Sequence, residues 1–372
     1  MKNWLCVSAG IVVGEWFYFT ISNGNGLFRC NIEKSQLDYL GRFPKEKENQ
    51  SHLFYRISHY KNTLFFWAHQ AQNHVLYDLE KNRFSDFACE SIKINFVENV
   101  VNRDKNIYIY GRHEDPYIYR YDRERNDGRY IIKNMNAVKE EYSSFTILAS
   151  GMAYDDKHAY FPCLTDTILS FNWKTEELVP IYLPLSDACL THIISMQDSL
   201  FLLDITGCLM QYDKRTEEVK SLFNIKHSGV DYIEGKTEYH ILLRYEDCLY
   251  MVSKKRDCEM ICYNYKTDEV YFGDRSLMRN NAGFVELYGF MLYVFDNLKG
   301  SLVRINLKTY DTVEIDCTDL FNIADHQSSG HYYINEGFHI CNSLSTYIYN
   351  IEENLKNSSK LRNCGMEIYE KI

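Results

Sequence analysis

The chain of 372 residues contains only 5 Pro and 4 Trp, and none of its apolar runs approaches the length of a membrane span. A helix needs about 20 consecutive apolar residues to cross a bilayer. The N-terminal stretch from Leu5 to Val13 is interrupted by Ser8 and Gly10, and it lacks a convincing signal-peptide cleavage site. We therefore expect a cytoplasmic protein without a membrane partner.

Concentrated positive charge is also scarce. The formal net charge is -10, and the only tight basic cluster, at residues 254–256, is followed at once by Asp257. Such short charge runs are typical of solvated turns. Binding to nucleic acid through its phosphates needs a concentrated basic surface, so we expect no nucleic-acid partner.

Motifs that carry known chemistry are missing too. The chain has no glycine-rich phosphate loop, no nucleophile elbow, no His-Glu-x-x-His and no Cys-x-x-Cys. Its 12 Cys are scattered singly, which favours reduced, buried thiols, and the close pair Cys258 and Cys262 lacks a second pair at metal-ligand spacing. We expect neither a cofactor nor a metal site. No catalytic residue can be assigned, which favours a protein that is not an enzyme.

Aromatic residues, in contrast, are abundant. The chain has 31 Tyr and 21 Phe, with 45% hydrophobic and 25% charged residues. This balance is that of a globular protein, and aromatic side chains fit pleated, half-buried strand surfaces. The composition predicts an all-β fold.

A short apolar stretch that ends in Asp or Asn before a polar turn recurs eight times. The eight elements are Arg29-Cys30-Asn31, Leu76-Tyr77-Asp78, Arg120-Tyr121-Asp122, Ser170-Phe171-Asn172, Gln211-Tyr212-Asp213, Cys262-Tyr263-Asn264, Arg304-Ile305-Asn306 and Ile348-Tyr349-Asn350. Their spacing of roughly 40 to 50 residues is the repeat length of a four-stranded propeller blade. An Asp or Asn here can accept hydrogen bonds from backbone N–H groups two or three residues on, which would close a hairpin.

Each repeat also contains an aromatic run, such as Trp16 to Phe19 or Leu64 to Trp67, that is apolar on both faces. This pattern is typical of a strand buried between two neighbouring sheets. We predict a single β-propeller domain over residues 1–372, with eight, or alternatively seven, four-stranded antiparallel blades. The predicted blades span approximately residues 9–44, 52–90, 94–132, 143–184, 190–224, 239–274, 282–316 and 330–372. Either residues 4–7 or residues 366–369 could supply the strand that closes the last blade.

The repeats resemble Kelch-like propeller blades, in which a strand ends in a Tyr-Asp type element before a polar turn. The paired glycine and the later Trp of Kelch blades are missing here. The resemblance covers nearly the whole chain and implies the architecture alone, with no activity assigned to any residue.

A ligand site is expected on the propeller face that carries the loops between second and third strands and the connections between blades. Long connections run over residues 133–142, 224–239 and 316–330, and long loops are often functional. Four histidines stand at predicted starts of innermost strands, and an arginine follows two of them by four residues. The candidate ligand-binding residues are His52, Arg56, His192, His240, Arg244, His331, Tyr142, His227, Tyr232 and His326.

Two functions fit these features. The first is a non-catalytic scaffold that engages a protein or peptide partner through the loop face, with aromatic residues as anchors. The alternative is a carbohydrate-binding or carbohydrate-active propeller, with His, Arg, Asp and Glu side chains at the channel mouth and aromatic rings as stacking platforms. The four histidines could also be unrelated residues on different blades.

Overall fold

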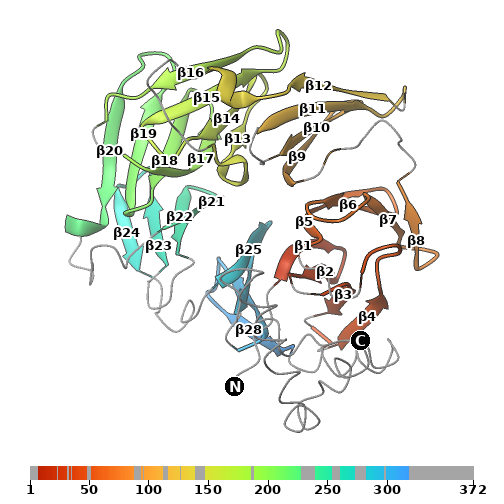
Figure 1. Ribbon diagram of the computed structural model, residues 1–372. Coiled ribbons are helices and arrows are strands. Elements are labelled where there is room, and N and C mark those ends of the chain that lie inside the picture. Colours follow the sequence, from red (N-terminus) through yellow and green to blue (C-terminus); the bar gives the residue numbers. More distant parts are fainter. Residues whose placement is uncertain are drawn as a thin grey trace, which may run out of the picture. The chain divides into compact units, whose positions relative to one another are not determined.

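The computed structural model describes residues 7–22, 24–31, 33–34, 36–47, 52–87, 94, 96–111, 116–125, 127–138, 147–185, 188–227, 239–253, 260–272, 282–296 and 299–317. Within these ranges the chain forms seven four-stranded antiparallel sheets and three short 3-10 helices (Figure 1). The all-β propeller prediction is therefore confirmed with the smaller of the two blade numbers.

The chain divides into two compact units: unit 1, residues 1–97 and 281–372, and unit 2, residues 98–280. Unit 1 holds blades 1, 2 and 7. Blade 1 consists of β1 (Val7–Val13), β2 (Trp16–Ile21), β3 (Leu27–Asn31) and β4 (Gln36–Gly41). Blade 2 consists of β5 (Phe54–Tyr60), β6 (Thr63–Ala68), β7 (Val75–Asp78) and β8 (Arg83–Asp86). Blade 7 consists of β25 (Ala282–Tyr288), β26 (Met291–Asp296), β27 (Ser301–Asn306) and β28 (Thr312–Asp316).

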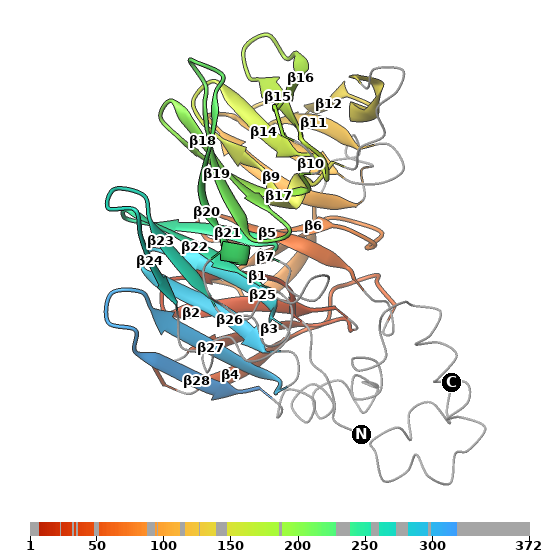
Figure 2. The same cartoon turned by 90° about the vertical axis from the view of Figure 1, so that its left-hand side faces the viewer.

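Unit 2 holds blades 3 to 6 (Figure 2). Blade 3 consists of β9 (Val97–Arg103), β10 (Asn106–Gly111), β11 (Tyr117–Asp122) and β12 (Asp127–Ile132), followed by η1 (Met135–Val138) and η2 (Ala149–Gly151). Blade 4 consists of β13 (Ala153–Tyr154), β14 (His158–Pro162), β15 (Thr167–Asn172) and β16 (Leu178–Tyr182). Blade 5 consists of β17 (Leu190–Met196), β18 (Ser199–Asp204), β19 (Cys208–Asp213) and β20 (Val219–Asn224), followed by η3 (Ile225–His227). Blade 6 consists of β21 (Ile241–Tyr245), β22 (Cys248–Val252), β23 (Ile261–Asn264) and β24 (Glu269–Phe272).

The expected eighth blade, residues 330–372, lies outside the described residues, as do the basic cluster at 254–256, Cys258 and residues 366–369. Blade 7 already packs against blade 1, because β1 contacts both β5 and β25. Among the described residues, therefore, no further sheet lies between these two blades, and the described blade number is seven, the alternative of the two predicted numbers. Val7 is also no spare strand, since it belongs to β1 and pairs with Ile21.

The core lies between adjacent blades. Second strands are buried on both faces, as their aromatic runs predict, and in β2 every residue after Trp16 is buried. Blades 1 and 7 share a cluster in which the Phe17 ring lies 5.5 Å from that of Phe284 and 5.6 Å from that of Tyr293. Gly10 permits this packing, because a Cβ there would lie 2.4 Å from the Phe17 ring.

The third-strand Asp or Asn closes a turn in every described blade, as predicted. In blade 5, for example, Asp213 Oδ1 accepts hydrogen bonds from the N–H groups of Arg215, at 2.8 Å, and Thr216, at 2.9 Å. The same side-chain oxygen accepts one or two backbone N–H groups in the other six blades. Asn350, the eighth such residue, lies outside the described residues.

The seven cysteines that the structure describes are all free thiols, and four of them are buried. Among the described residues, no helix is long and apolar enough to cross a bilayer.

Candidate functional site

The structure describes five of the ten predicted ligand-binding side chains. These five are His52, Arg56, His192, His240 and Arg244. Only the backbone of His227 is described, as the last residue of η3. The other four, Tyr142, Tyr232, His326 and His331, lie outside the described residues.

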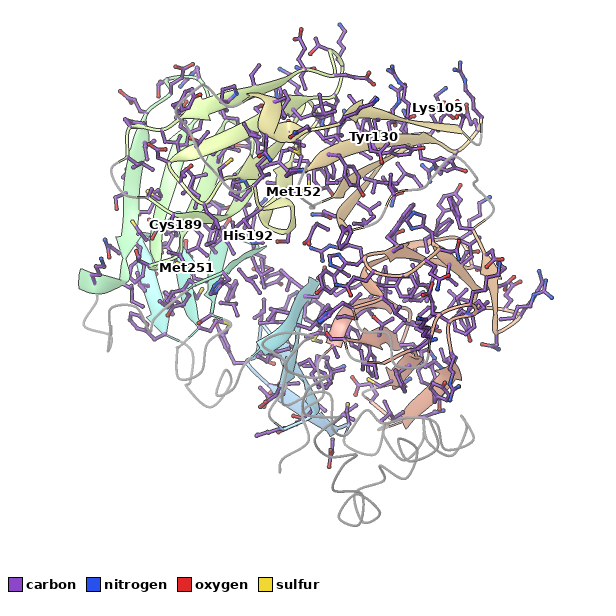
Figure 3. All side chains as sticks on the ribbon, in the orientation of Figure 1. Lys105, Tyr130, Met152, Cys189, His192 and Met251 are labelled. Atoms are coloured by element: carbon purple, nitrogen blue, oxygen red, sulfur yellow. The ribbon has the colours of Figure 1, made fainter. Side chains whose placement is uncertain are left out.

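In unit 2, the predicted residues occupy the first strands of blades 5 and 6. His192 is half-buried on β17 (Figure 3), and His240 directly precedes β21, which contacts β17. Arg244 is exposed on β21, and its Nε donates to the Glu246 carbonyl at 3.2 Å. A shared ligand site formed by these side chains stays a prediction.

In unit 1, His52 belongs to an aromatic cluster at the entry to β5. The Tyr55 hydroxyl lies 2.8 Å from His52 Nδ1, and the Tyr55 ring stacks on His69 with centroids 3.8 Å apart. Phe96 contacts the other side of His69 edge-on, at 5.2 Å. Tyr55 can reach both histidines because the β5 register shifts between Phe54 and Arg56, and such a bulge re-aims the side chain.

A third histidine lies on the loop that follows β6. His74 is buried, and its Nδ1 accepts a hydrogen bond from the Ala68 N–H at 2.9 Å. The ring packs edge-on against Trp67, at 5.4 Å, and Phe87, at 6.3 Å. Because Nδ1 is an acceptor, the proton of the neutral ring resides on Nε2, which is buried without a hydrogen-bond partner among the described residues.

All three imidazoles favour the neutral state. Burial lowers the pKa of His52, and it lowers the pKa of His74 to about 4. Burial also lowers the pKa of His69 to about 4, with a contribution from the nearby His52. Three neutral imidazoles could in principle ligate a metal, but no group of three or more His, Cys, Asp or Glu in the described part of the chain could hold one.

Arg56 projects from β5 near a carboxylate of blade 7. Desolvation raises the pKa of Glu286 on β25, and the positive charge of Arg56 opposes that rise. The sequence hypothesis missed Glu286, because no local signal relates it to a residue more than 200 positions earlier.

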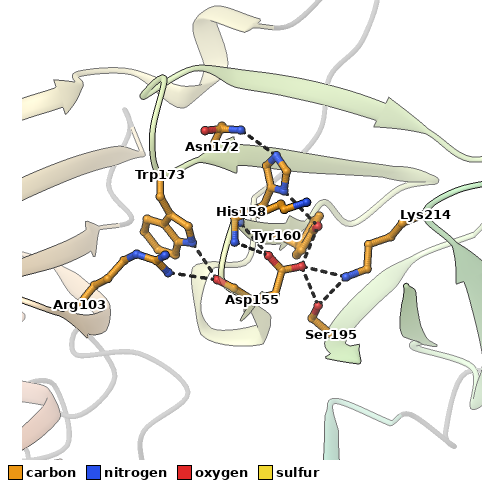
Figure 4. Close-up of polar contacts among 9 residues, drawn as sticks. Arg103, Asp155, His158, Tyr160, Asn172, Trp173, Ser195 and Lys214 are labelled. Atoms are coloured by element: carbon orange, nitrogen blue, oxygen red, sulfur yellow. Dashed lines mark hydrogen bonds and ion pairs between the residues drawn. The ribbon is translucent and has the colours of Figure 1, made fainter. Parts of the chain in front are cut away.

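The densest polar cluster of the described residues lies in unit 2, around the turn between β13 and β14 (Figure 4). Asp155 Oδ2 accepts hydrogen bonds from Lys214 Nζ at 2.8 Å, Tyr160 OH at 3.1 Å and Ser195 Oγ at 3.2 Å. Its Oδ1 accepts the backbone N–H groups of Lys157 and His158, both at 2.8 Å. Five donors thus surround one carboxylate.

Two more side chains hold the backbone of the same turn. Trp173 Nε1 donates to the Asp155 carbonyl at 2.9 Å, and Arg103 Nη1 donates to it at 3.2 Å. The Arg103 guanidinium lies 5.1 Å from the Trp173 ring centroid, within the range of a cation–π contact. The cluster therefore joins side chains of blades 3, 4 and 5.

The charges of this cluster are compensated. Partial burial alone would raise the pKa of Asp155, but the hydrogen bonds from Lys214 and the two amides hold it well below its usual range. A carboxylate that binds protons so weakly is a poor general base for the Ser195 hydroxyl. Lys214 cannot serve as one either while it is paired with Asp155. The arrangement is that of a structural junction.

In unit 1, four exposed aromatic rings lie at turns on the opposite ends of the strands from the expected loop face. We call Tyr60, Tyr288, Phe290 and Tyr310 of unit 1 the aromatic turn surface. Their exposed fractions are 49%, 43%, 36% and 49%. Tyr60 and Tyr288 close the hairpins between first and second strands, by pairing with Thr63 and Met291. Phe290 and Tyr310 lie in turns of blade 7 that are joined by the Leu307 N–H to Phe290 carbonyl hydrogen bond of 2.9 Å.

Two lysines lie over rings of this surface. Lys308 Nζ is 4.7 Å from the centroid of Phe290, and Lys61 Nζ is 5.4 Å from that of Tyr60. A cation over the ring face keeps an exposed aromatic side chain near a polar group. The sequence hypothesis missed this surface because it looked for function on the other set of loops.

No family model matches the sequence, and no curated protein matches it. Solved structures do align. Virginiamycin B lyase from Staphylococcus aureus, in a catalytically inactive form with quinupristin, aligns with a TM-score of 0.58 and 9% identity over 80% of this chain and 94% of that chain. The computationally designed protein Ika8 aligns with a TM-score of 0.54 and 10% identity over 85% and 88%.

A third likeness is to a part of a larger protein. The extracellular domain of a putative hybrid two-component system from B. thetaiotaomicron aligns with a TM-score of 0.53 and 12% identity, over 80% of this chain but 39% of that chain. At such low identities these likenesses show the fold alone. The chain is a β-propeller protein of seven described blades, and no Kelch family is shown.

Proposed function

We propose that the chain is a non-catalytic binding module that engages a protein or peptide partner through the aromatic turn surface. The observation that carries this proposal is the exposure of four large aromatic rings at the turns of two blades of one unit. Exposed Tyr and Phe are enriched at protein interfaces, where they supply large contact areas at a low cost in side-chain entropy.

The setting of these rings supports the same proposal. Tyr60 and Tyr288 lie on hairpins whose two-residue turns place Lys61 and Gly289 at positive φ, 53° and 60°. Tight hairpins of this kind hold the flanking side chains in fixed positions. A partner would therefore meet rings in fixed positions. The propeller would lose little conformational entropy on binding.

The test compares two pairs of equally exposed rings. The Tyr288→Ser and Phe290→Ser double variant removes two rings of the aromatic turn surface. The control is Tyr271→Ser with Phe272→Ser, because these residues are 48% and 42% exposed on the outer strand β24 of unit 2. Loss of two interface anchors is expected to weaken partner binding at least tenfold, which corresponds to about 1.4 kcal/mol.

Binding would be measured by affinity capture from a lysate of the source organism, with quantitative mass spectrometry and then titration of the purified partner. Loss in the first variant and retention in the control supports the proposal. Equal retention in both variants contradicts it, and loss in the control alone would move the binding surface to β24. Failure of both to fold would be seen by circular dichroism, and Tyr310→Ser would then replace the double variant.

Cytoplasmic localisation is part of this proposal and is supported by the free thiols of the described cysteines. Sugar binding is the alternative. Binding of the wild-type protein to a glycan array, and its loss in the Tyr288→Ser and Phe290→Ser double variant, would favour sugar binding, since aromatic rings also stack on sugars.

A further inference from the structure

The loop between β6 and β7, residues 69–74, is held by an unusual number of contacts. Its backbone N–H groups reach back to the entry of β5, from His69 to the Leu53 carbonyl at 2.8 Å and from Gln70 to the His52 carbonyl at 3.1 Å. The His69 carbonyl accepts the Phe96 N–H at 2.8 Å. A carboxylate binds the far end of the loop, since the Gln72 N–H donates to Glu46 Oε1 at 2.7 Å.

The side chains of His69 and His74 fix the two ends of this loop. His74 accepts the last N–H of β6, from Ala68, on Nδ1. His69 is stacked on Tyr55 and is hydrogen-bonded to the Val97 backbone, while its Nδ1 is buried without a hydrogen-bond partner among the described residues. Neither ring has a free exposed nitrogen to receive a proton.

The surroundings of both rings disfavour a positive charge. His74 packs against Trp67 and Phe87, and no charged group contributes to its titration. In the part of the chain that the structure describes, Tyr55 and His52 are the titratable groups that contact or act on His69, and a charge on His52 would repel one on His69. On the other side of the loop, the Glu46 carboxylate already accepts two hydrogen bonds from backbone N–H groups of the loop.

Two residues beside the His69 cluster have an unfavourable backbone conformation. His52 and Phe96, which flank the His69 cluster in space, have φ values of 52° and 59°. Bulky residues rarely adopt this left-handed region because the side chain crowds the backbone there. The closed loop is therefore maintained against local strain, and a modest loss of contacts would favour opening.

We propose that the β6–β7 loop is an acid-sensitive latch, closed while His69 and His74 are neutral and opened when either imidazole gains a proton. This inference goes beyond partner binding and does not depend on it. A proton on His74 must occupy Nδ1, so it displaces the Ala68 N–H from its acceptor. Among the described residues, the resulting cation is packed against the rings of Trp67 and Phe87 and not against a carboxylate, whereas an open loop hydrates it.

The direction of the effect follows from proton linkage. The closed state has histidine pKa values of about 4, against 6.5 for a solvated ring, so the open state binds more protons between these values. Opening therefore increases as the pH falls from about 6.5 toward 4. Burial raises the pKa of Glu46, which favours the closed state in acid and offsets part of the effect.

Hydrogen exchange with mass spectrometry on the full chain tests the latch. After correction for the intrinsic exchange rate, protonation of each histidine is expected to contribute an increase of about 30-fold in opening of the peptide over residues 64–79 between pH 7.5 and pH 5. Peptides from β18 and β19 in unit 2 serve as the internal reference and are expected to keep their protection.

The decisive variant is His74→Asn, because the Asn side-chain oxygen can take the place of Nδ1 as acceptor for Ala68 without titrating. It is expected to reduce the acid response at least fivefold, and His59→Asn, which changes an exposed histidine of the same blade, is expected to leave it unchanged. Where His74→Asn fails to fold, His69→Gln gives the same comparison. An unchanged response in the variant that folds, no response in the wild type, or equal loss of protection in β18 and β19 would each overturn the proposal.

Discussion

Asp155 is the residue whose charge is compensated by the polar cluster of unit 2. Its carboxylate collects five donors from blades 4 and 5, and its carbonyl accepts two more from Arg103 and Trp173. Removing the charge leaves the half-buried Lys214 without its anion, which is more costly than the loss of an exposed ion pair.

We expect Asp155→Asn to lower the free energy of unfolding by about 2 kcal/mol in urea denaturation at pH 7. Asp156→Asn is the matched control, because Asp156 is exposed in the same turn, and it should have little effect. Since the pKa of Asp155 is lowered in the folded state, its contribution is present above about pH 4 and lost as the pH falls further. Equal stability of the two variants at pH 7 would show that the cluster does not stabilise the fold.

At the scale of single elements, the recurring turn after each third strand is the most regular feature. Asn264 Oδ1 accepts the N–H groups of Lys266, at 3.0 Å, and Thr267, at 3.2 Å, so it satisfies two turn donors with one side chain. Replacement of such a residue by Ala leaves these donors to water and frees the turn.

Asn264→Ala is expected to cost about 1 kcal/mol of unfolding free energy, measured by thermal and urea denaturation. Asn264→Asp keeps the acceptor oxygen and should retain most of the stability, as Asp fills the equivalent position in blades 2, 3 and 5. If Asp were as destabilising as Ala, hydrogen bonding would not be the cause.

The same elements show what sequence could predict. The blade period, the buried second strands and the Asx turns were predictable, because each depends on residues within one repeat. The cluster of Tyr55 with His69 was not, since it depends on a bulge in β5 that has no sequence signal. The aromatic turn surface was missed because function was expected on the other set of loops. Burial of most Tyr and Phe in the repeats also leaves no sequence signal for the few rings that remain exposed.

At the scale of the whole molecule, the contact between the first and last described blades is the joint that the chain must form between distant segments. Each described blade is built from consecutive strands, so within the described ranges no strand exchange secures this joint. It consists of the apolar cluster around Phe17 and of the ion pair between Arg304 and Glu33, in which Glu33 is 69% exposed.

The apolar cluster should dominate. Phe17→Ala is expected to lower the unfolding free energy by about 3–5 kcal/mol, because Phe17 is 2% exposed and packs on three other rings. Glu33→Gln removes the ion pair and should cost less than about 1 kcal/mol. Urea titrations of both variants measure the contrast, and similar losses would mean that charge pairing contributes as much as packing.

The packing of blade 7 on blade 1 also has a consequence for synthesis on the ribosome. Phe17 and Phe19 are synthesised long before their partners Phe284, Tyr293 and Phe295 in the last described blade. At about 5–20 residues per second, the nascent chain carries this unpaired apolar face for about 15–60 s. During that interval collisions between nascent chains would favour aggregation, and chaperones that cover the apolar face would oppose it.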